Sequence, residues 1–296
     1  MSPSLSYYLV LIVLKLKRVK SIFSTSPVDY QKLRKEDVKK PSSRFWRGYI
    51  MKRFKAGNSV VTSVKSQPTS EKLILFIHGG AYISGPGMHH WKAVRKMARL
   101  THHEIWLVDY PKSPENDIRE IFMSIKSVYH MALTTFKPDE VVLIGDSVGG
   151  SLALTLLQTL NEDSDEMPKS AFLISPVLDA TLSNDAIPEV DLLDPMLSRK
   201  GIRSAKEMCA KDVKLTDPTI SPINGSLDGL PPLHLYFAEY DITYPDQLLF
   251  LDKLKTAKVE YSLRTGRKMP HIWPLIYQLK EGRESLNGII EELKLI

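Results

Sequence analysis

Residues 140–160 read EVVLIGDSVGGSLALTLLQTL, and this stretch decides the fold. A short apolar run of the kind that forms a buried strand ends at Ile144, and a helical pattern of leucines starts at Leu152. Between them, Gly145–Gly150 holds a G-x-S-x-G pattern centred on Ser147. A serine on a tight strand-to-helix turn stands exposed above a sheet, and the helix N-terminus behind it favours developing negative charge. The stretch therefore predicts a strand, a turn and a helix that present Ser147 as a nucleophile.

Apolar runs and helical patterns alternate on both sides of this stretch. The strand-like runs are 72–78, 104–110, 140–144, 171–177, 233–238 and 259–263, and helical spacing is found over 91–98, 118–128 and 152–160. Such alternation predicts a mostly parallel sheet flanked by helices on both faces. A weaker pattern over 46–66 predicts a hairpin that turns at Gly57-Asn58.

One segment, 178–229, interrupts the alternation. It has no strand signal, it is rich in Asp and Pro, and it contains one predicted helix near 196–210. A loop of this length in a compact domain is usually functional or holds an inserted element. We interpret the segment as a cap over the carboxyl edge of the sheet, and we expect residues 1–296 to form a single domain.

The composition is that of a globular protein, with 43% hydrophobic and 25% charged residues and a net charge of +6. Basic and acidic residues are mixed along the chain, so we expect a solvated surface and no nucleic-acid partner. Cys209 is the one cysteine, in a polar setting, which excludes an internal disulfide and suits a reducing compartment. We therefore expect a cytoplasmic protein. Homo-oligomerisation is left open.

The N-terminal run Tyr7–Leu14 is apolar but shorter than the ~20 residues that span a bilayer. Its basic residues follow the run, whereas a signal peptide carries them in front. We favour a helix packed on the domain or its cap. The alternative is an interfacial helix whose basic flank touches a membrane surface or a lipid substrate.

A serine hydroxyl needs a base to take its proton. In strand–turn–helix hydrolases the chain order is Ser, acid, His, and His271 is the one histidine beyond the last strong apolar strand. Asp241 directly follows the strand-like run that starts at Leu233, so we assign it as the acid. Glu239 lies within that strand, and Asp246 fits the first turn of the next helix, where a carboxylate is expected for capping alone.

An oxyanion also needs preorganised N–H donors. His78-Gly79-Gly80-Ala81 ends the first strong strand, and we expect the N–H groups of Gly79, Gly80 and Val148 to form the oxyanion hole. We expect His78 to support this loop rather than to transfer protons.

Four motifs in this order resemble the hormone-sensitive-lipase family of α/β-hydrolases, which are mostly bacterial esterases. They are His78-Gly79-Gly80-Ala81 (family HGGG), 109–115 DYPKSPE (DYRLAPE), 145–150 GDSVGG (GDSAGG), and the DP…SP and GLPP elements of 217–232 that lead to Asp241. The resemblance covers 72–275. It implies an α/β-hydrolase fold with a helical cap built from 1–45 plus 178–228.

Two departures from the family pattern concern the substrate. Ala81 replaces the last glycine of HGGG and is expected to tighten the acyl pocket. Val148 replaces alanine beside the nucleophile, keeps the N–H, and is expected to add bulk near the oxyanion.

Together these features predict a serine carboxylester hydrolase of the esterase or lipase type. It would cleave small-molecule esters of short acyl chains through Ser147, Asp241, His271 and an acyl-enzyme. We find no HExxH, cysteine pair or P-loop, so no metal or organic cofactor is expected. The alternatives are an amidase resembling arylformamidases and a non-catalytic ligand-binding protein on the same scaffold.

Overall fold

A computed structural model describes residues 3–68 and 70–296 of the chain. Its centre is one sheet of eight strands in the spatial order β1-β2-β4-β3-β5-β6-β7-β8. The strands are Ile50–Ala56 (β1), Ser59–Lys65 (β2), Leu73–Ile77 (β3), Glu104–Asp109 (β4), Val141–Asp146 (β5), Ser170–Ile174 (β6), Leu233–Tyr240 (β7) and Tyr261–Pro270 (β8). Only β2 runs antiparallel to its neighbours, and β1 and β2 form the hairpin expected at Gly57-Asn58. The predicted mostly parallel sheet is confirmed.

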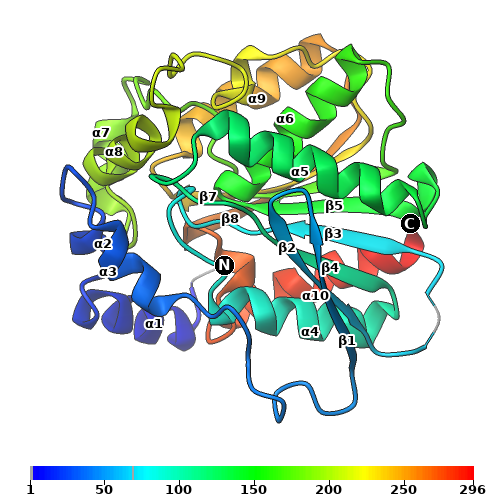
Figure 1. The fold of residues 1–296 in the computed structure, drawn as a ribbon. Helices are drawn as coiled ribbons and strands as arrows, with labels where there is room; N and C mark the ends of the chain where they lie inside the picture. Colours follow the sequence, from blue (N-terminus) through cyan, green and yellow to red (C-terminus); the bar gives the residue numbers. More distant parts are fainter. Residues whose placement is uncertain (1–2, 69) are drawn as a thin grey trace.

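Helices cover both faces of the sheet (Figure 1). The α-helices are Leu5–Leu16 (α1), Val19–Ile22 (α2), Tyr30–Leu33 (α3), Met88–Thr101 (α4), Ile118–Leu133 (α5), Val148–Glu162 (α6), Ile187–Leu193 (α7), Arg199–Ala210 (α8), Tyr244–Thr256 (α9) and Lys280–Leu295 (α10), with short 3₁₀ turns at Arg34–Glu36, Pro138–Glu140, Pro222–Asn224 and Trp273–Leu275. None of the described helices is both long and apolar enough to cross a membrane.

The apolar core lies in two layers, one on each side of the sheet. In β3, Leu73 and Leu75 pack in the layer under α5, α6 and α9, whereas Ile74 and Phe76 pack in the layer under α4 and α10. Successive side chains of a strand point to opposite faces, so a strand buried on both sides is apolar throughout. This is why the central strands appear in the sequence as unbroken apolar runs.

Two segments far apart in sequence meet at one end of the sheet (Figure 1). Phe23 and Val28 from the N-terminal segment form one apolar cluster with Ile187 and Ile202 from α7 and α8. α8 also approaches α2 so closely that a Cβ at Gly201 would lie 1.8 Å from the Phe23 carbonyl oxygen. These are the two segments expected to build a cap, apart from residues 1 and 2, which lie outside the described residues.

The segment 178–229 holds two α-helices where the sequence predicted one. The prediction near 196–210 corresponds to α8, and the additional helix is α7, Ile187–Leu193. With only seven residues, of which Ile187 alone is buried, α7 has too few buried positions to show a helical period.

Candidate active site

The turn after β5 holds Ser147 in a strained conformation. Its backbone has φ 54° and ψ −124°, a region that non-glycine residues rarely occupy and that costs roughly 1–3 kcal/mol. The Ser147 N–H donates to the Ile174 carbonyl at 2.8 Å, and the Ser147 carbonyl accepts from the N–H of Gly150 at 3.0 Å. The strain is therefore held by β6 on one side and by the first turn of α6 on the other.

The glycines around Ser147 allow the strand and helix to approach each other. A Cβ at Gly145 would lie 2.3 Å from the Gly149 carbonyl oxygen, and a Cβ at Gly149 would lie 2.0 Å from the Ile77 carbonyl oxygen. Both distances are too short for any side chain, so the G-x-S-x-G pattern has a steric origin in this fold.

His271 and Asp241 form a buried pair. His271 Nδ1 donates to Asp241 Oδ2 at 2.7 Å, and Asp241 Oδ1 accepts from the N–H and the hydroxyl of Thr243 at 2.9 and 2.8 Å. Burial alone would lower the pKa of His271. Asp241 outweighs that effect, so the pKa of His271 is raised above its ordinary value. The bond at Nδ1 leaves Nε2 as the atom available to take a proton.

The loop that carries His271 is tied to the sheet beside Ser147. The N–H of Ile272 donates to the hydroxyl of Ser175 at 3.1 Å, and Ser175 is fully buried at the end of β6. Ser147 and His271 line the same cavity, but no hydrogen bond joins them in the described structure. In free enzymes such bonds are often long and tighten only when substrate binds.

The two rival carboxylates are placed differently. Asp246 lies in the first turn of α9, as its sequence setting predicted, and its Oδ1 accepts from Asn184 at 3.0 Å. Burial raises the pKa of Asp246 to about 7. Glu239 lies in β7 and accepts the N–H of Lys268 at 2.8 Å. Neither residue has a hydrogen bond to His271 among the described residues.

The loop 78–86, which we call the HGGA loop, begins at the end of β3 and lies against the Ser147 turn. The N–H of Gly79 donates to Asp146 Oδ1 at 3.0 Å. The sequence had assigned this N–H to the oxyanion hole, but the bond to Asp146 makes it unavailable. No acceptor within the described ranges takes the N–H groups of Gly80, Ala81 or Val148.

Val148 also differs from expectation in its side chain. It packs in the apolar core under α5 and α6, and it is absent from the residues that line the catalytic cavity. Ala81 does line the cavity. The expected bulk near the carbonyl therefore concerns Ala81 alone, because the helical direction of α6 turns the Val148 side chain away.

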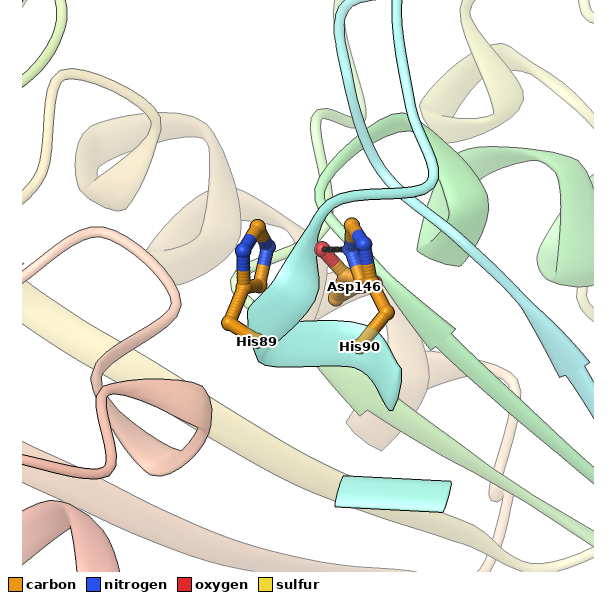
Figure 2. A group of neighbouring side chains, drawn as sticks. All are labelled: His89, His90 and Asp146. Atoms are coloured by element: carbon orange, nitrogen blue, oxygen red, sulfur yellow. Dashed lines mark hydrogen bonds and ion pairs between the residues drawn. The ribbon is translucent and has the colours of Figure 1, made fainter. Parts of the chain in front are cut away.

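Asp146 connects the HGGA loop to α4, and Figure 2 shows its contact with His90 of α4. His90 Nδ1 accepts the N–H of Gly87 at 2.9 Å, so its other nitrogen, Nε2, carries the proton that is donated to Asp146 at 3.1 Å. Burial alone would raise the pKa of Asp146. His90 and the Gly79 N–H outweigh it, and the pKa is lowered. The carboxylate next to Ser147 thus stays charged and joins the HGGA loop to α4.

His89, His90 and Asp146 are also the described group whose donor atoms, all within 4.8 Å, would suit a metal ion. A metal on His90 Nε2 would require that nitrogen to lose its proton, while the Gly87 N–H already occupies Nδ1. We therefore interpret His90 and Asp146 as a hydrogen-bonded pair that supports the turn at Ser147, with His89 next to them on the cavity (Figure 2).

His78 is buried within the HGGA loop. Its Nδ1 donates to the Gly79 carbonyl at 2.5 Å, its ring stacks on Tyr110 at 4.4 Å, and the Tyr110 hydroxyl donates to the His78 carbonyl at 2.8 Å. Burial lowers the pKa of His78 well below its ordinary value, so the ring is neutral. His78 is not among the residues that line the cavity, and its role as a support of the loop stays a prediction.

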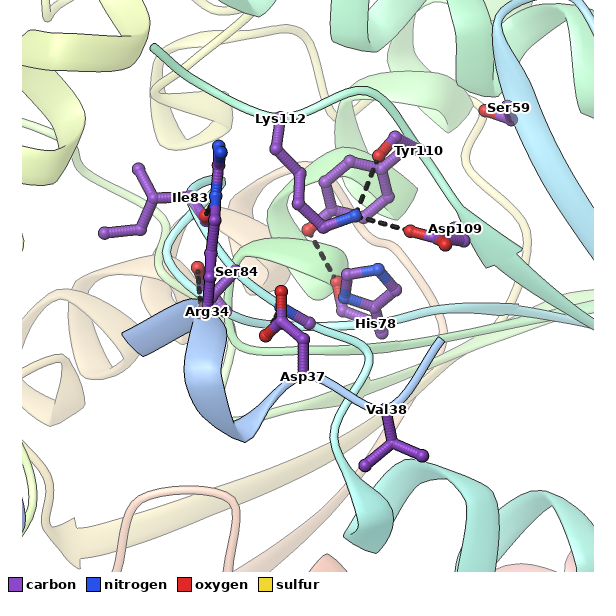
Figure 3. A network of polar contacts seen from close by, with 12 residues as sticks. Arg34, Asp37, Val38, Ser59, His78, Ile83, Ser84, Asp109, Tyr110 and Lys112 are labelled. Carbon is purple, nitrogen blue, oxygen red and sulfur yellow. Dashed lines mark hydrogen bonds and ion pairs between the residues drawn. The ribbon is translucent and has the colours of Figure 1, made fainter. Parts of the chain in front are cut away.

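The N-terminal segment forms hydrogen bonds with the other side of the HGGA loop (Figure 3). Asp37 Oδ1 accepts the N–H of Gly85 at 2.6 Å, and Arg34 Nε donates to the Ile83 carbonyl at 2.7 Å. Burial raises the pKa of Asp37. No motif predicted these two residues, because they lie in a polar stretch far from the loop in chain order.

Asp194 is a second functional candidate that the sequence did not reveal. It is buried at the end of α7, where Oδ1 accepts the N–H groups of Met196 and Leu197 at 2.7 and 2.8 Å. Its Oδ2 accepts the N–H of Ile242 at 3.0 Å. Burial and the nearby Asp241 raise the pKa of Asp194. In the sequence, Asp194-Pro195 looks like an ordinary turn.

The site opens into a cavity of about 760 Å³. Ser147, His271, Gly80 and Ala81 are among the residues at its base. Its walls come from residues 17–37 of the N-terminal segment and from Met196, Leu197 and Ile202 of the segment 178–229. Pockets of this size accommodate small organic ligands.

Comparisons with known proteins support the fold and the class of protein. The chain matches a family described as alpha/beta hydrolase fold over residues 74–275. An esterase from Acinetobacter venetianus is 33% identical over 236 residues, which cover 77% of this chain and 76% of that protein. A crystal structure of EstE5 that was soaked with p-nitrophenyl butyrate has a TM-score of 0.88 at 26% identity, covering 99% of this chain and 98% of that one.

An esterase from the bacterial hormone-sensitive lipase family has a TM-score of 0.87 at 21% identity, over 100% of this chain and 99% of that one, which is a likeness of fold. The chain belongs to the α/β-hydrolase family, and it shares its fold with an esterase of the hormone-sensitive lipase family. It is a member of a hydrolase family whose curated relatives include proteins named esterase and lipase.

Proposed function

We propose that the chain is a serine carboxylester hydrolase that cleaves small esters through Ser147, His271 and Asp241. The observation that carries the proposal is the His271–Asp241 bond of 2.7 Å beside the strained Ser147 turn, with Ser147 and His271 on one cavity. The relatives named esterase and lipase support the same reaction class.

The reaction takes two steps. Ser147 Oγ attacks the ester carbonyl while His271 Nε2 takes the hydroxyl proton, and Asp241 stabilises the imidazolium that results. The tetrahedral intermediate collapses, His271 returns the proton to the leaving alcohol, and an acyl-enzyme remains on Ser147. Water then attacks the acyl group with His271 again as base, which releases the acid and restores Ser147.

The oxyanion hole consists, in this proposal, of the N–H groups of Gly80, Ala81 and Val148. The Ala81 N–H replaces the Gly79 N–H that we predicted from the sequence, because the Gly79 N–H is bonded to Asp146. Gly80 and Ala81 both have positive φ, 126° and 55°, which turns this part of the HGGA loop out of an extended path. Preorganised donors of this kind typically contribute ~10²–10³-fold to kcat each.

The preferred substrate is an ester of a short acyl chain, because Ala81 adds a methyl group beside the carbonyl and two segments of chain wall the cavity. EstE5 was soaked with a four-carbon ester of this kind. We expect p-nitrophenyl butyrate to be turned over faster than the palmitate ester. Faster turnover of palmitate would contradict this preference.

A fluorophosphonate probe tests the nucleophile, with intact-mass measurement of the wild type and of Ser147→Ala. We expect one label on the wild type and none on the variant. A parallel panel of aryl esters and formanilides separates an esterase from an amidase. An unlabelled wild type, or turnover of formanilides alone, would contradict the proposal.

A further inference from the structure

The first helix is apolar on both of its faces. Its inner face, Tyr7, Val10, Leu11 and Leu14, packs against a cluster that includes Met269 and Trp273, on either side of His271. The outer face of α1 is equally apolar. It consists of Leu5, Tyr8, Leu9, Ile12, Val13 and Leu16, each between 49% and 77% exposed. At 3.6 residues per turn these six lie within an arc of about 140°.

Polar contacts fix α1 in this orientation. The Ser4 N–H and hydroxyl donate to Glu281 at 2.6 and 2.9 Å, and the N–H of Lys280 donates to the Ser6 hydroxyl at 2.8 Å. The helix is therefore attached to α10 at its start. α1 lies at the edge of the fold (Figure 1), and the side chains of its outer face are exposed.

Positive charge gathers at the end of this face. Residues 3–28 contain four basic residues, Lys15, Lys17, Arg18 and Lys20, and no acidic one. Lys20 is paired with Asp191 at 3.0 Å. Among the described residues, Lys15, Lys17 and Arg18 have no acidic partner, and all three are exposed. An apolar face beside unpaired cations is complementary to a surface that is apolar inside and anionic outside.

The same end of α1 borders the catalytic cavity. Lys17, Val19, Ile22 and Phe23 line the cavity together with Ser147 and His271. α1 has 12 residues and is thus about 18 Å long, less than the ~30 Å of a hydrocarbon core. It can lie along a bilayer surface, and that position would bring the cavity close to the lipid.

We propose that the outer face of α1, with Lys15, Lys17 and Arg18, docks the enzyme on an anionic lipid surface and directs the cavity toward ester substrates held there. The choice of substrate rests on the proposed function, whereas the docking itself does not. The inner face of α1 attaches the helix to the loop of His271. The outer face contacts the membrane.

Flotation of the full chain with vesicles tests the docking, using phosphatidylcholine with and without phosphatidylglycerol. We expect binding to the anionic vesicles, weaker binding at high salt, and little binding to phosphatidylcholine alone. Leu9→Ser with Ile12→Ser should weaken binding about tenfold or more, and Lys15→Gln with Arg18→Gln should weaken it several-fold.

Matched controls lie elsewhere on the surface. Leu248→Ser with Leu249→Ser removes two leucines of α9 that are 43% and 51% exposed, and Lys52→Gln with Arg53→Gln removes the same charge from β1. Neither pair should alter vesicle binding. Equal loss in the controls would show general adhesion of a basic protein and would overturn the proposal.

Two further measurements separate the other outcomes. Sedimentation velocity of the wild type and of Leu9→Ser with Ile12→Ser would reveal a dimer held by this face. A dimer that the variant dissociates, together with no vesicle binding, would overturn the proposal in favour of a second copy of the chain.

Turnover of soluble butyrate ester and fluorophosphonate labelling should stay unchanged in both α1 variants. A wild type that binds vesicles but is not labelled would leave the docking intact and contradict the proposed function alone.

Discussion

The base of the catalytic cavity comes from loops at strand ends, whereas its rim comes from the N-terminal segment. At the base, Ser147 follows β5 and its N–H donates to the Ile174 carbonyl of β6, whereas Asp241 follows β7 and its carboxylate accepts the N–H of Thr243, two residues further on. At the rim, Arg34 and Asp37 reach the HGGA loop by side-chain bonds across nearly fifty positions of sequence. We infer that ester cleavage depends on the residues at the bottom of the cavity. The N-terminal residues at the rim adjust the conformation of the HGGA loop and the access of substrate to the cavity.

The largest effect on activity is expected at Ser147. We expect Ser147→Ala to lower kcat by up to ~10⁶-fold while leaving the fold unchanged, because the variant lacks the hydroxyl that attacks the ester carbonyl. Ester turnover with active-site titration measures the loss, and circular dichroism checks the fold. Retention of a tenth of wild-type activity would be incompatible with Ser147 as the nucleophile.

The next effect concerns the two carboxylates near the end of β7. We expect Asp241→Asn to lower kcat ~10⁴-fold, since an amide favours the wrong imidazole tautomer. Asp246→Asn is its matched control and should stay within a few-fold, because Asp246 bonds Asn184 rather than His271. One ester assayed with both variants decides between them. Reversed effects would make Asp246 the acid.

A smaller effect is expected at the rim. Asp37→Ala removes the acceptor of the Gly85 N–H, and we expect kcat/KM to fall about tenfold as the HGGA loop loosens. Asp37→Asn retains an oxygen at that position and should recover most of the activity. Rates for both variants, with melting temperatures alongside, check this. An alanine variant as active as the wild type would show that the rim does not position the loop.

The smallest effect is a shift in pH dependence. His271 acts as a base only when neutral, and its pKa is raised, so kcat/KM should rise with pH through a limb above the ordinary histidine value of ~6.5. The carboxylate of Asp194 is one of the charges that raise it. Asp194→Asn should therefore move the limb to lower pH by a fraction of a unit.

Asp191→Asn serves as the control for that shift, because Asp191 pairs with Lys20 and is not among the charges that act on His271. A pH profile from each variant distinguishes an electrostatic effect from a general loss of stability, which would lower the rate at every pH. Identical limbs in the wild type and in Asp194→Asn would remove Asp194 from the set of groups that influence the base.

The sequence alone determined the parts whose signals are local. The elbow at Ser147 needs glycines where strand and helix meet, and strands buried on both faces need continuous apolar runs. The positions of Asp241 and His271 followed from chain order and strand ends. Periodicity and turn chemistry carry this information because they act between neighbours in the chain.

Tertiary structure decided the rest. The N–H of Gly79 donates a hydrogen bond to Asp146, and the side chain of Val148 packs in the core. No local sequence pattern encodes either contact. The hydrogen bond between Asp37 and the N–H of Gly85 likewise forms only because two segments distant in sequence meet in the fold. For α1, the sequence posed a packed helix and an interfacial helix as alternatives. Only the packing on Trp273 and Met269 assigned one face to the interior and left the other exposed, since a helix that is apolar all round does not specify which side is covered.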